Sequence, residues 1–165
     1  YGNPYDEHTE MGTVITEASA IEIEKRINET IAAGAKLLCG NKREGALLSP
    51  TVLDFTKNDF PVCAKETFGP VAPLFRFDTE AEVVRRANDT EFGLAAYFYT
   101  RDLARSWRVQ EALEYGIVGI NEGIISTEVA PFGGVKSSGL GREGSKYGIE
   151  DYLEIKYLAL GGIGT

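Results

Sequence analysis

The alternation of helical and strand-like patterns between residues 16 and 121 constrains the fold more than any other feature of the sequence. Thr16 is a suitable helix N-cap, and Gly34 is a suitable stop for the helix that follows. Apolar side chains recur between these positions at three- and four-residue spacing: Ala20, Ile23, Ile27 and Ile31. The spacing predicts an amphipathic helix over residues 16–33.

Strand-like segments complete the alternation, at residues 35–39, 47–55, 71–77, 95–99 and 117–121. A capping box formed by Thr79 and Glu82 predicts a second helix over residues 80–88. Asp102 is the expected N-cap of a third helix that ends before Gly116. The apolar positions of this third helix are Leu103, Trp107 and Leu113. The order of elements favours an α/β fold, in which a parallel sheet is flanked by helices on both faces.

The last third of the chain has a different pattern. Residues 123–148 are rich in glycine and hold few apolar runs, as expected of a long loop that approaches another group closely. Apolar and charged side chains then alternate in residues 152–160: Leu153, Ile155 and Tyr157 against Glu154 and Lys156. The alternation predicts a half-buried terminal strand, which needs a sheet edge in its own domain or in a partner.

Composition argues against several functional classes. The formal net charge of -8 disfavours a nucleic-acid surface, because phosphate binding draws on clustered Lys and Arg. No run approaches the roughly 18 apolar residues of a membrane helix, and no basic stretch followed by an apolar one occurs near residue 1. Cys39 and Cys63 lie in or beside apolar stretches without CxxC spacing. We expect a cytoplasmic protein with two buried, inert thiols and no metal site.

Two further features do not indicate a site. Gly139, Gly141 and Gly144 spell GxGxxG, but residues 131–138 before them form a loop rather than an apolar strand. No acidic residue closes a βαβ unit after them, so the pattern does not predict a dinucleotide-binding turn. His8 is the only histidine and lies in a polar segment, where we expect a solvated loop residue. Catalysis by a Ser-His-Asp triad has no support.

Two sequence motifs carry a resemblance to a known family. Residues 65–70, KETFGP, resemble the ETFGP motif of the aldehyde dehydrogenase superfamily, and residues 131–139, PFGGVKSSG, resemble its PFGGxKxSG motif. Residues 121–126, NEGIIS, and 139–148, GLGREGSKYG, are similar to the succinate-semialdehyde dehydrogenase branch. The resemblance extends over essentially the whole chain.

The resemblance implies oxidation of an aldehyde to a carboxylic acid with NAD or NADP. In the family a cysteine thiolate attacks the aldehyde, hydride leaves for the nicotinamide, and water activated by a glutamate releases the acid. Neither that cysteine nor that glutamate is matched here, because the family places the nucleophile and the cofactor domain upstream of this region. We therefore expect no catalytic residue in this chain and no activity of the chain alone.

The resemblance also assigns two domain portions. Residues 1–148 resemble the C-terminal portion of the catalytic domain, and residues 149–165 resemble the C-terminal strand that the family uses in subunit association. The chain opens at Tyr1 without an initiator Met, which favours a portion of a longer enzyme. A homo-oligomer is expected, either a dimer or a tetramer.

Three positions match functional residues of the family, and a fourth is expected beside them. Glu66 resembles the glutamate that accepts hydrogen bonds from the nicotinamide ribose, with a turn-capping carboxylate as the structural alternative. Phe68 matches an aromatic residue beside the nicotinamide ring, although such a residue is by default core. Ser126 matches a residue that the succinate-semialdehyde branch uses on the substrate carboxylate. Phe132 would form an apolar wall of the aldehyde tunnel, with loop packing as its alternative.

One alternative of a different class remains open. The chain could be a freestanding, non-catalytic association or binding domain derived from the aldehyde dehydrogenase fold. The missing initiator Met and the lack of a matched nucleophile favour the portion of a longer enzyme over this alternative. The preference for NAD or NADP stays undecided, because the 2'-phosphate is recognised in the cofactor domain.

Overall fold

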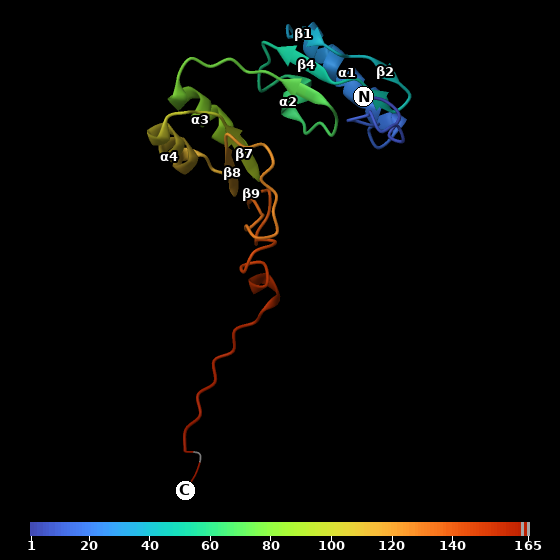
Figure 1. Cartoon of the computed structure of the whole chain (residues 1–165). Helices are drawn as coiled ribbons and strands as arrows, with labels where there is room; N and C mark the ends of the chain where they lie inside the picture. Colours follow the sequence, from blue (N-terminus) through green and yellow to red (C-terminus); the bar gives the residue numbers. More distant parts are fainter. Residues whose placement is uncertain (163, 165) are drawn as a thin grey trace. The chain divides into compact units, whose positions relative to one another are not determined.

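The computed structural model describes residues 1–162 and 164. The chain divides into two compact units, residues 1–77 and residues 78–165 (Figure 1). No helix in the described ranges is long and apolar enough to cross a membrane.

Helix α1 (Glu17–Ala32) organises the first unit. The Thr16 side chain accepts a hydrogen bond from the backbone N–H of Ser19 at 3.1 Å, as its position before the apolar pattern predicts. The predicted face of α1 is buried at Ala20, Ile23 and Ile27. Ile31 is only half-buried, because Thr30 occupies the fully buried position beside it. The core cluster contains Ile23, Ile27, Leu48, Leu53 and Val62.

The sheet of the first unit has the strand order β1-β4-β5, formed by β1 (Lys36–Cys39), β4 (Thr51–Asp54) and β5 (Val71–Pro73). The hairpin of β2 (Arg43–Glu44) and β3 (Leu47–Leu48) lies between β1 and β4 in the chain, and β1 is antiparallel to β4. The short helix α2 (Pro61–Ala64) lies between β4 and β5, and these strands are parallel. The parallel pairing of β4 and β5 agrees with the segment that connects them, because parallel neighbouring strands need a crossover connection.

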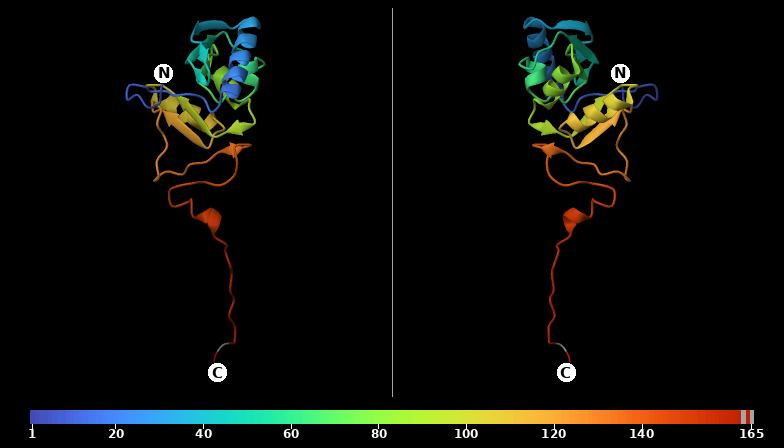
Figure 2. Two further views of the ribbon diagram at one scale, coloured as in Figure 1. Left: turned by 90° about the vertical axis from the view of Figure 1, so that its right-hand side faces the viewer. Right: turned by 90° about the vertical axis from the view of Figure 1, so that its left-hand side faces the viewer.

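The second unit repeats this relation with a longer helix. Strands β7 (Ala95–Phe98) and β8 (Ile117–Ile120) are parallel and are connected through α4 (Leu103–Ala112), which lies beside them (Figure 2). Helix α3 (Glu80–Asn88) has the predicted bounds. Strands β6 (Phe92–Gly93) and β9 (Val135–Lys136) pair antiparallel, and the 3-10 helix η1 (Glu150–Tyr152) follows.

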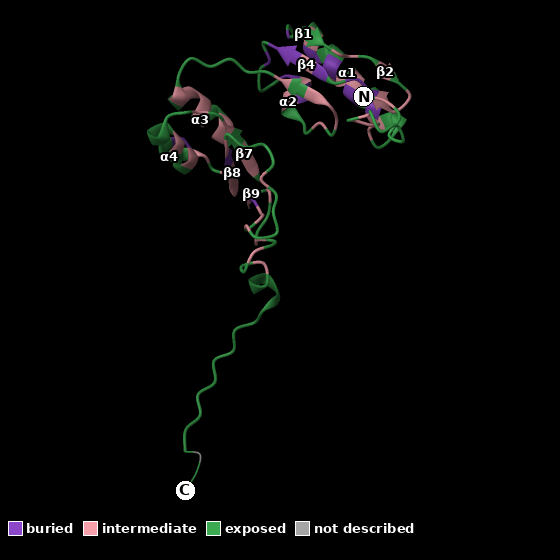
Figure 3. Cartoon of the chain, viewed as in Figure 1, coloured by how far each residue is buried: buried purple, intermediate pink, exposed green. Residues whose placement is uncertain are grey.

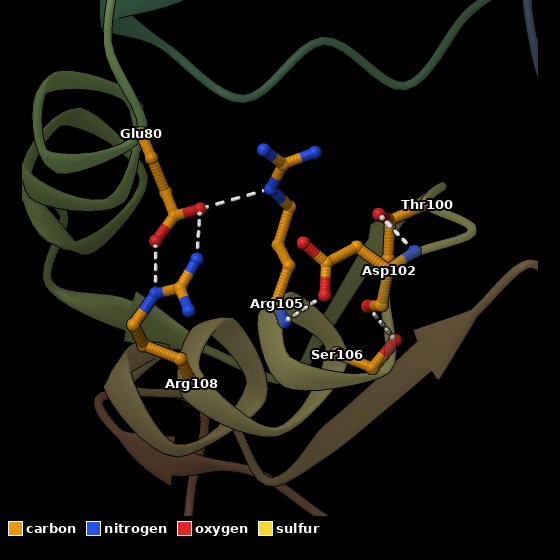
Figure 4. Close-up of polar contacts among 6 residues, drawn as sticks. All are labelled: Glu80, Thr100, Asp102, Arg105, Ser106 and Arg108. Carbon is orange, nitrogen blue, oxygen red and sulfur yellow. Dashed lines mark hydrogen bonds and ion pairs between the residues drawn. The ribbon is translucent and has the colours of Figure 1, made fainter.

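Helices α3 and α4 are joined by one carboxylate between two guanidinium groups (Figure 4). Glu80, the first residue of α3, accepts two hydrogen bonds from Arg108, at 2.6 and 2.8 Å, and one from Arg105 at 3.0 Å. The hydrogen bond from Arg108 is the largest of the causes that lower the pKa of Glu80 to about 2. Desolvation opposes it, and the hydrogen bond from Arg105 lowers the pKa further. The carboxylate therefore stays ionised over the whole neutral and mildly acidic range.

The predicted α/β content is confirmed, but the predicted sheet is wrong in detail. In place of a parallel sheet flanked by helices on both faces, the described residues form one three-stranded mixed sheet and three two-stranded sheets. Among the described strands, parallel pairs occur only at β4–β5 and β7–β8, where a helix connects the strands. The remaining pairs, β1–β4, β2–β3 and β6–β9, are antiparallel.

The predicted terminal strand is absent from the single chain. Residues 153–160 form no helix or strand, and every side chain in this stretch is exposed (Figure 3). Ile155 and Tyr157, expected to be half-buried, are 99% and 88% exposed. A strand needs a neighbouring edge for its backbone groups, and no described strand of this chain pairs with the segment. The division at residues 148 and 149 stays a prediction.

The prediction of two buried thiols is wrong for Cys39. Cys39 is exposed, because β1 is an edge strand whose four residues all contact solvent. Cys63 is half-buried on α2 and packs against the core cluster. Burial raises the pKa of the Cys63 thiol, in spite of a hydrogen bond with Thr56 that lowers it.

Candidate functional site

Residues 65–70 form a loop, here called the ETFGP loop, that is fixed at both ends. It begins where α2 ends, and the Thr67 hydroxyl donates to the carbonyl of Lys65 at 3.3 Å. The Gly69 N–H donates to the Thr67 carbonyl at 2.9 Å. At the far end, the Pro70 carbonyl accepts from the N–H of Thr51 on β4 at 2.8 Å. The backbone of the loop is thus bonded to β4, and its conformation does not depend on contacts of the exposed Glu66 and Phe68 side chains.

Helix α1 supports the same loop from its buried side. The Arg26 Nη1 donates to the Glu66 carbonyl at 3.1 Å. A Cβ atom at Gly69 would lie 2.7 Å from Cδ1 of Ile23, so the backbone approaches α1 as closely as glycine allows. Two residues on one face of α1 therefore contact the two ends of the ETFGP loop.

The two predicted cofactor-side residues are presented to solvent on this loop. Phe68 is 77% exposed, so its default role as a core residue does not apply within the described chain. Glu66 is also exposed, and its carboxylate makes no hydrogen bond to other described residues. The turn-capping alternative for Glu66 therefore has no hydrogen bond to support it. Both side chains are available to a ligand or to another polypeptide segment.

In the second unit, residues 121–126 leave the end of β8. Asn121 has a φ of 59° and bridges to the backbone of Thr100, accepting at 2.8 Å and donating at 2.7 Å. The Glu122 carboxylate accepts from the N–H groups of Gly123 and Ile124 at 3.0 and 3.1 Å. These contacts shape the loop that carries Ser126, whose side chain is exposed.

Residues 131–139, here called the PFGG loop, are held by the glycine-rich segment that follows them. Phe132 and Glu143 exchange two backbone hydrogen bonds, at 2.9 and 2.7 Å. The Arg142 Nη1 donates to the carbonyls of Gly134 and Gly141 at 2.9 and 2.7 Å. Phe132 is half-buried by this arrangement. Its side chain is therefore neither fully buried nor fully exposed, and its place in an aldehyde tunnel stays a prediction.

Lys136, inside the PFGG loop, has a role that sequence reasoning missed. Its Nζ donates to the carbonyls of Asn88 and Thr90 at 2.9 and 3.2 Å and pairs with Glu114 at 2.5 Å. A cation at the last residue of α3 satisfies a helix-terminal carbonyl and interacts favourably with the helix dipole. The motif lysine thus anchors the loop, and nothing in its local sequence indicates the distant carbonyls.

A groove of about 710 Å³ lies beside the PFGG loop. Its lining includes Phe132, Gly134, Arg142 and Asp151, and it does not include Ser126. The structure therefore places Phe132 on a groove of the second unit and Ser126 outside that groove. Glu66 and Phe68 share one loop of the first unit. Among the described residues, no group of three or more His, Cys, Asp or Glu side chains is arranged to hold a metal ion.

The geometry also agrees with the rejection of GxGxxG as a dinucleotide-binding turn. Only the two-residue strand β9 precedes Gly139, and residues 139–149 contain no helix. A dinucleotide turn would need a buried strand before the glycines and a helix N-terminus directly after them. His8 is exposed in a polar loop, as predicted, with its side chain 88% exposed.

Comparison with known proteins decides the family. The model of the family described as "Aldehyde dehydrogenase family" matches residues 1–158. The chain belongs to this family. It is 58% identical over 163 residues to a succinate-semialdehyde dehydrogenase [NADP(+)] of Escherichia coli, covering 97% of this chain and 34% of that protein. It is also 58% identical over 160 residues to a glutarate-semialdehyde dehydrogenase of Pseudomonas putida, covering 96% and 33%.

A solved structure shows that the chain also has the fold of an aldehyde dehydrogenase. The aldehyde dehydrogenase 21 of Physcomitrella patens, in complex with the reaction product succinate, matches with a TM-score of 0.92 and 38% identity. The match covers 99% of this chain and 34% of the Physcomitrella chain. The segment spans about a third of the length of the curated relatives it matches, 34% and 33% in the two cases above.

Proposed function

We propose that this chain is a portion of an NAD(P)-dependent dehydrogenase that oxidises a carboxylate-bearing aldehyde, succinate semialdehyde, to the carboxylic acid. The observation that carries the proposal is the ETFGP loop, whose backbone is tied to α1 and β4 while Glu66 and Phe68 are exposed. Relatives that carry the names succinate-semialdehyde and glutarate-semialdehyde dehydrogenase support the substrate class.

On the cofactor side, the exposed residues fit a nicotinamide nucleotide. An ionised carboxylate is acceptor-only and can take two hydroxyl donors at once, which suits Glu66 to a ribose. Phe68 offers an apolar ring face beside it, which suits contact with a planar heterocycle. When bound, the nicotinamide supplies the hydride acceptor for aldehyde oxidation. Glu66 and Phe68 would orient that ring relative to the substrate, and neither takes part in bond making.

On the substrate side, Ser126 and Phe132 would bind different parts of a semialdehyde, the carboxylate and the methylene chain. The Ser126 hydroxyl can donate to the substrate carboxylate, although a neutral donor binds an anion weakly without a cation nearby. The exposed part of Phe132 would contact the methylene chain. Succinate and glutarate semialdehydes differ by one methylene, which a hydrophobic pocket distinguishes by only about 1–3 kcal/mol. Both therefore belong to the proposed substrate class.

The covalent chemistry would require residues outside this segment. Neither cysteine fits the role of the thiolate nucleophile: Cys63 has a pKa raised by burial, and Cys39 lies on an exposed edge strand without a base at hydrogen-bond distance among the described residues. The contribution of this segment is binding and orientation.

The test is the substitution Glu66→Gln in the full-length dehydrogenase that contains this segment. The change keeps the size of the side chain and removes charge-assisted hydrogen bonds, each worth about 1.5–3 kcal/mol. Single-turnover hydride transfer should slow by roughly tenfold or more. Glu10→Gln, at another exposed glutamate of the first unit, is the matched control. Unchanged hydride transfer together with unchanged cofactor affinity in Glu66→Gln would contradict the assignment.

A further inference from the structure

We infer that Arg26 of α1 is a positioning residue for Glu66, which fixes the backbone of the ETFGP loop so that the carboxylate meets the cofactor; this inference rests on the proposed function. The contact is a hydrogen bond of 3.1 Å from Nη1 of Arg26 to the carbonyl oxygen of Glu66. It joins residues 40 positions apart in the chain. The bond holds the backbone of Glu66 and leaves the Glu66 side chain exposed.

Arg26 is itself held in one orientation. Its Nε donates to Oε1 of Glu22 at 3.1 Å, one helical turn earlier on α1. The Arg26 side chain is only 20% exposed, so its apolar stem is packed while its guanidinium spans Glu22 and the loop. The planar guanidinium can serve both acceptors at once, because its Nε and Nη1 donors have fixed directions.

The helix that carries Arg26 is a rigid support. Ile23 and Ile27, on either side of Arg26 in the sequence, are 5% and 0% exposed in the core cluster. Ile23 also touches the other end of the loop, where Gly69 has no room for a Cβ atom. Two contacts with α1 therefore hold the ETFGP loop in place: an apolar contact at Gly69 and a polar contact at Glu66. Removal of the polar contact alone would loosen the backbone at Glu66, which then keeps only the neighbouring Thr67 hydrogen bonds, and would leave the Gly69 end in place.

The experiment uses the full-length dehydrogenase and the substitution Arg26→Met, which keeps an apolar stem and removes the donors. Loss of one hydrogen bond that positions Glu66 should raise the cofactor Kd by about threefold to tenfold and slow hydride transfer by a similar factor. The KM for the aldehyde should stay unchanged. Arg26→Lys, which retains a charged donor, should recover part of the loss.

Lys25→Met is the matched control, because Lys25 is on the same helix and, among the described residues, its only ion pair is with Glu29, at 3.9 Å. Equal thermal midpoints for Arg26→Met and Lys25→Met would show that α1 remains folded in both. If Arg26 acts through Glu66, its substitution should have little further effect on cofactor Kd in a Glu66→Gln background.

The outcomes separate the inference from the proposed function. If Glu66→Gln weakens cofactor binding while Arg26→Met behaves like Lys25→Met, the positioning role is wrong and the proposed function stands. Independent, multiplicative effects of Arg26→Met and Glu66→Gln would also overturn the positioning role. If Glu66→Gln has no effect on the cofactor, the cofactor role of Glu66 is wrong, and the inference about Arg26 falls with it.

Discussion

Single residues of the second unit show how closely its backbone segments approach one another. A Cβ atom at Gly116 would lie 2.0 Å from the carbonyl oxygen of Gly133 and 2.9 Å from Cα of Gly134. Both neighbours are backbone atoms of the PFGG loop, which cannot rotate away as a side chain would. Gly116, which ends the turn between α4 and β8, is therefore a determinant of where Phe132 lies.

The first prediction is that Gly116→Ala displaces the PFGG loop. Because the new methyl group meets backbone atoms, we expect the free energy of unfolding to fall by about 1–3 kcal/mol. In the full-length enzyme, the KM for the aldehyde should rise more than the KM for the cofactor. Gly123→Ala is the stability control, since its nearest contact is Oη of Tyr99 at 3.8 Å. A thermal midpoint for Gly116→Ala equal to that of Gly123→Ala would contradict this account of the loop.

The residues predicted correctly from the sequence are those whose contacts are local. Thr16, Thr79 and Asp102 each accept from a backbone N–H three positions later, as their places before apolar patterns indicate. The contacts of Lys136 with Asn88 and of Gly116 with Gly133 join positions far apart in the chain. Such contacts depend on tertiary packing, which local spacing does not specify.

Among the elements, α3 differs from α1 in how it is held to the rest of its unit. None of its residues is buried, whereas α1 buries four: Ala20, Ile23, Ile27 and Thr30. Glu80 joins α3 to α4 through Arg105 and Arg108 (Figure 4). The pKa of Glu80 is about 2 in the folded chain, below the usual value of 4.5, because the charged form is hydrogen-bonded.

The second prediction follows from this difference in pKa. A carboxyl group with a lowered folded-state pKa stabilises the fold fully above its unfolded-state pKa, and the stabilisation disappears as the pH falls through the folded-state pKa. The contribution of Glu80 should therefore be lost between pH 4.5 and about pH 2. We expect the difference in thermal midpoint between wild type and Glu80→Gln to shrink as the pH falls from about 6 to about 3. Glu7→Gln, at a side chain that is 88% exposed, is the control. A difference that does not change with pH would contradict the role of Glu80.

At the scale of elements, the sequence predicted the bounds of the helices well. It did not predict which part of the molecule packs against their apolar faces. The bounds of α3 agree with the capping box, and those of α4 with Asp102 as N-cap. The apolar positions Leu103 and Trp107 of α4 are nevertheless 73% and 63% exposed in the single chain. An amphipathic pattern predicts a face that packs, but it does not identify the partner of that face.

For the whole molecule, the decisive fact is length, since the chain spans 34% of the Escherichia coli relative that it matches at 58% identity. This chain, about a third as long as that relative, exposes apolar surfaces such as the Leu103 and Trp107 side chains of α4. The α/β class and the family were predictable, because motif residues and element order lie within the segment. The extent of the sheet and the environment of residues 153–160 were not, because both depend on strands that do not pair within the described chain.

The third prediction is that the 165-residue chain alone has no dehydrogenase activity. Without a thiolate positioned against the nicotinamide, no covalent intermediate forms from which hydride can leave. The purified chain, incubated with succinate semialdehyde and either nucleotide, should produce no NADH or NADPH, whereas the full-length enzyme should. Saturable, aldehyde-dependent formation of reduced nucleotide by the chain would contradict the prediction. Mass measurement of the native gene product would then separate a segment of a longer enzyme from a freestanding association domain.

The last prediction concerns residues 152–160, which we expect to pair with a sheet of another copy of the protein. Leu153, Ile155 and Tyr157 alternate with charged residues and are 59%, 99% and 88% exposed in the single chain. An alternating segment with unpaired backbone groups is suited to add a strand to an open sheet edge, which stabilises it by main-chain hydrogen bonds and by burial of its apolar side chains. Such a strand would join subunits of a homo-oligomer.

Deletion of the full-length protein from Tyr152 onward should therefore lower its oligomeric state and leave the α/β core folded. Deletion from Gly161 onward is the matched control, because it keeps the alternating segment and should leave the assembly intact. Analytical ultracentrifugation measures both, and circular dichroism confirms that the shortened subunit retains its helices. The full-length protein is the right material, because the isolated chain exposes apolar side chains such as Trp107 that could drive associations of their own. A protein shortened at Tyr152 that still sediments at the mass of the intact oligomer would show that the segment completes a sheet of its own subunit instead.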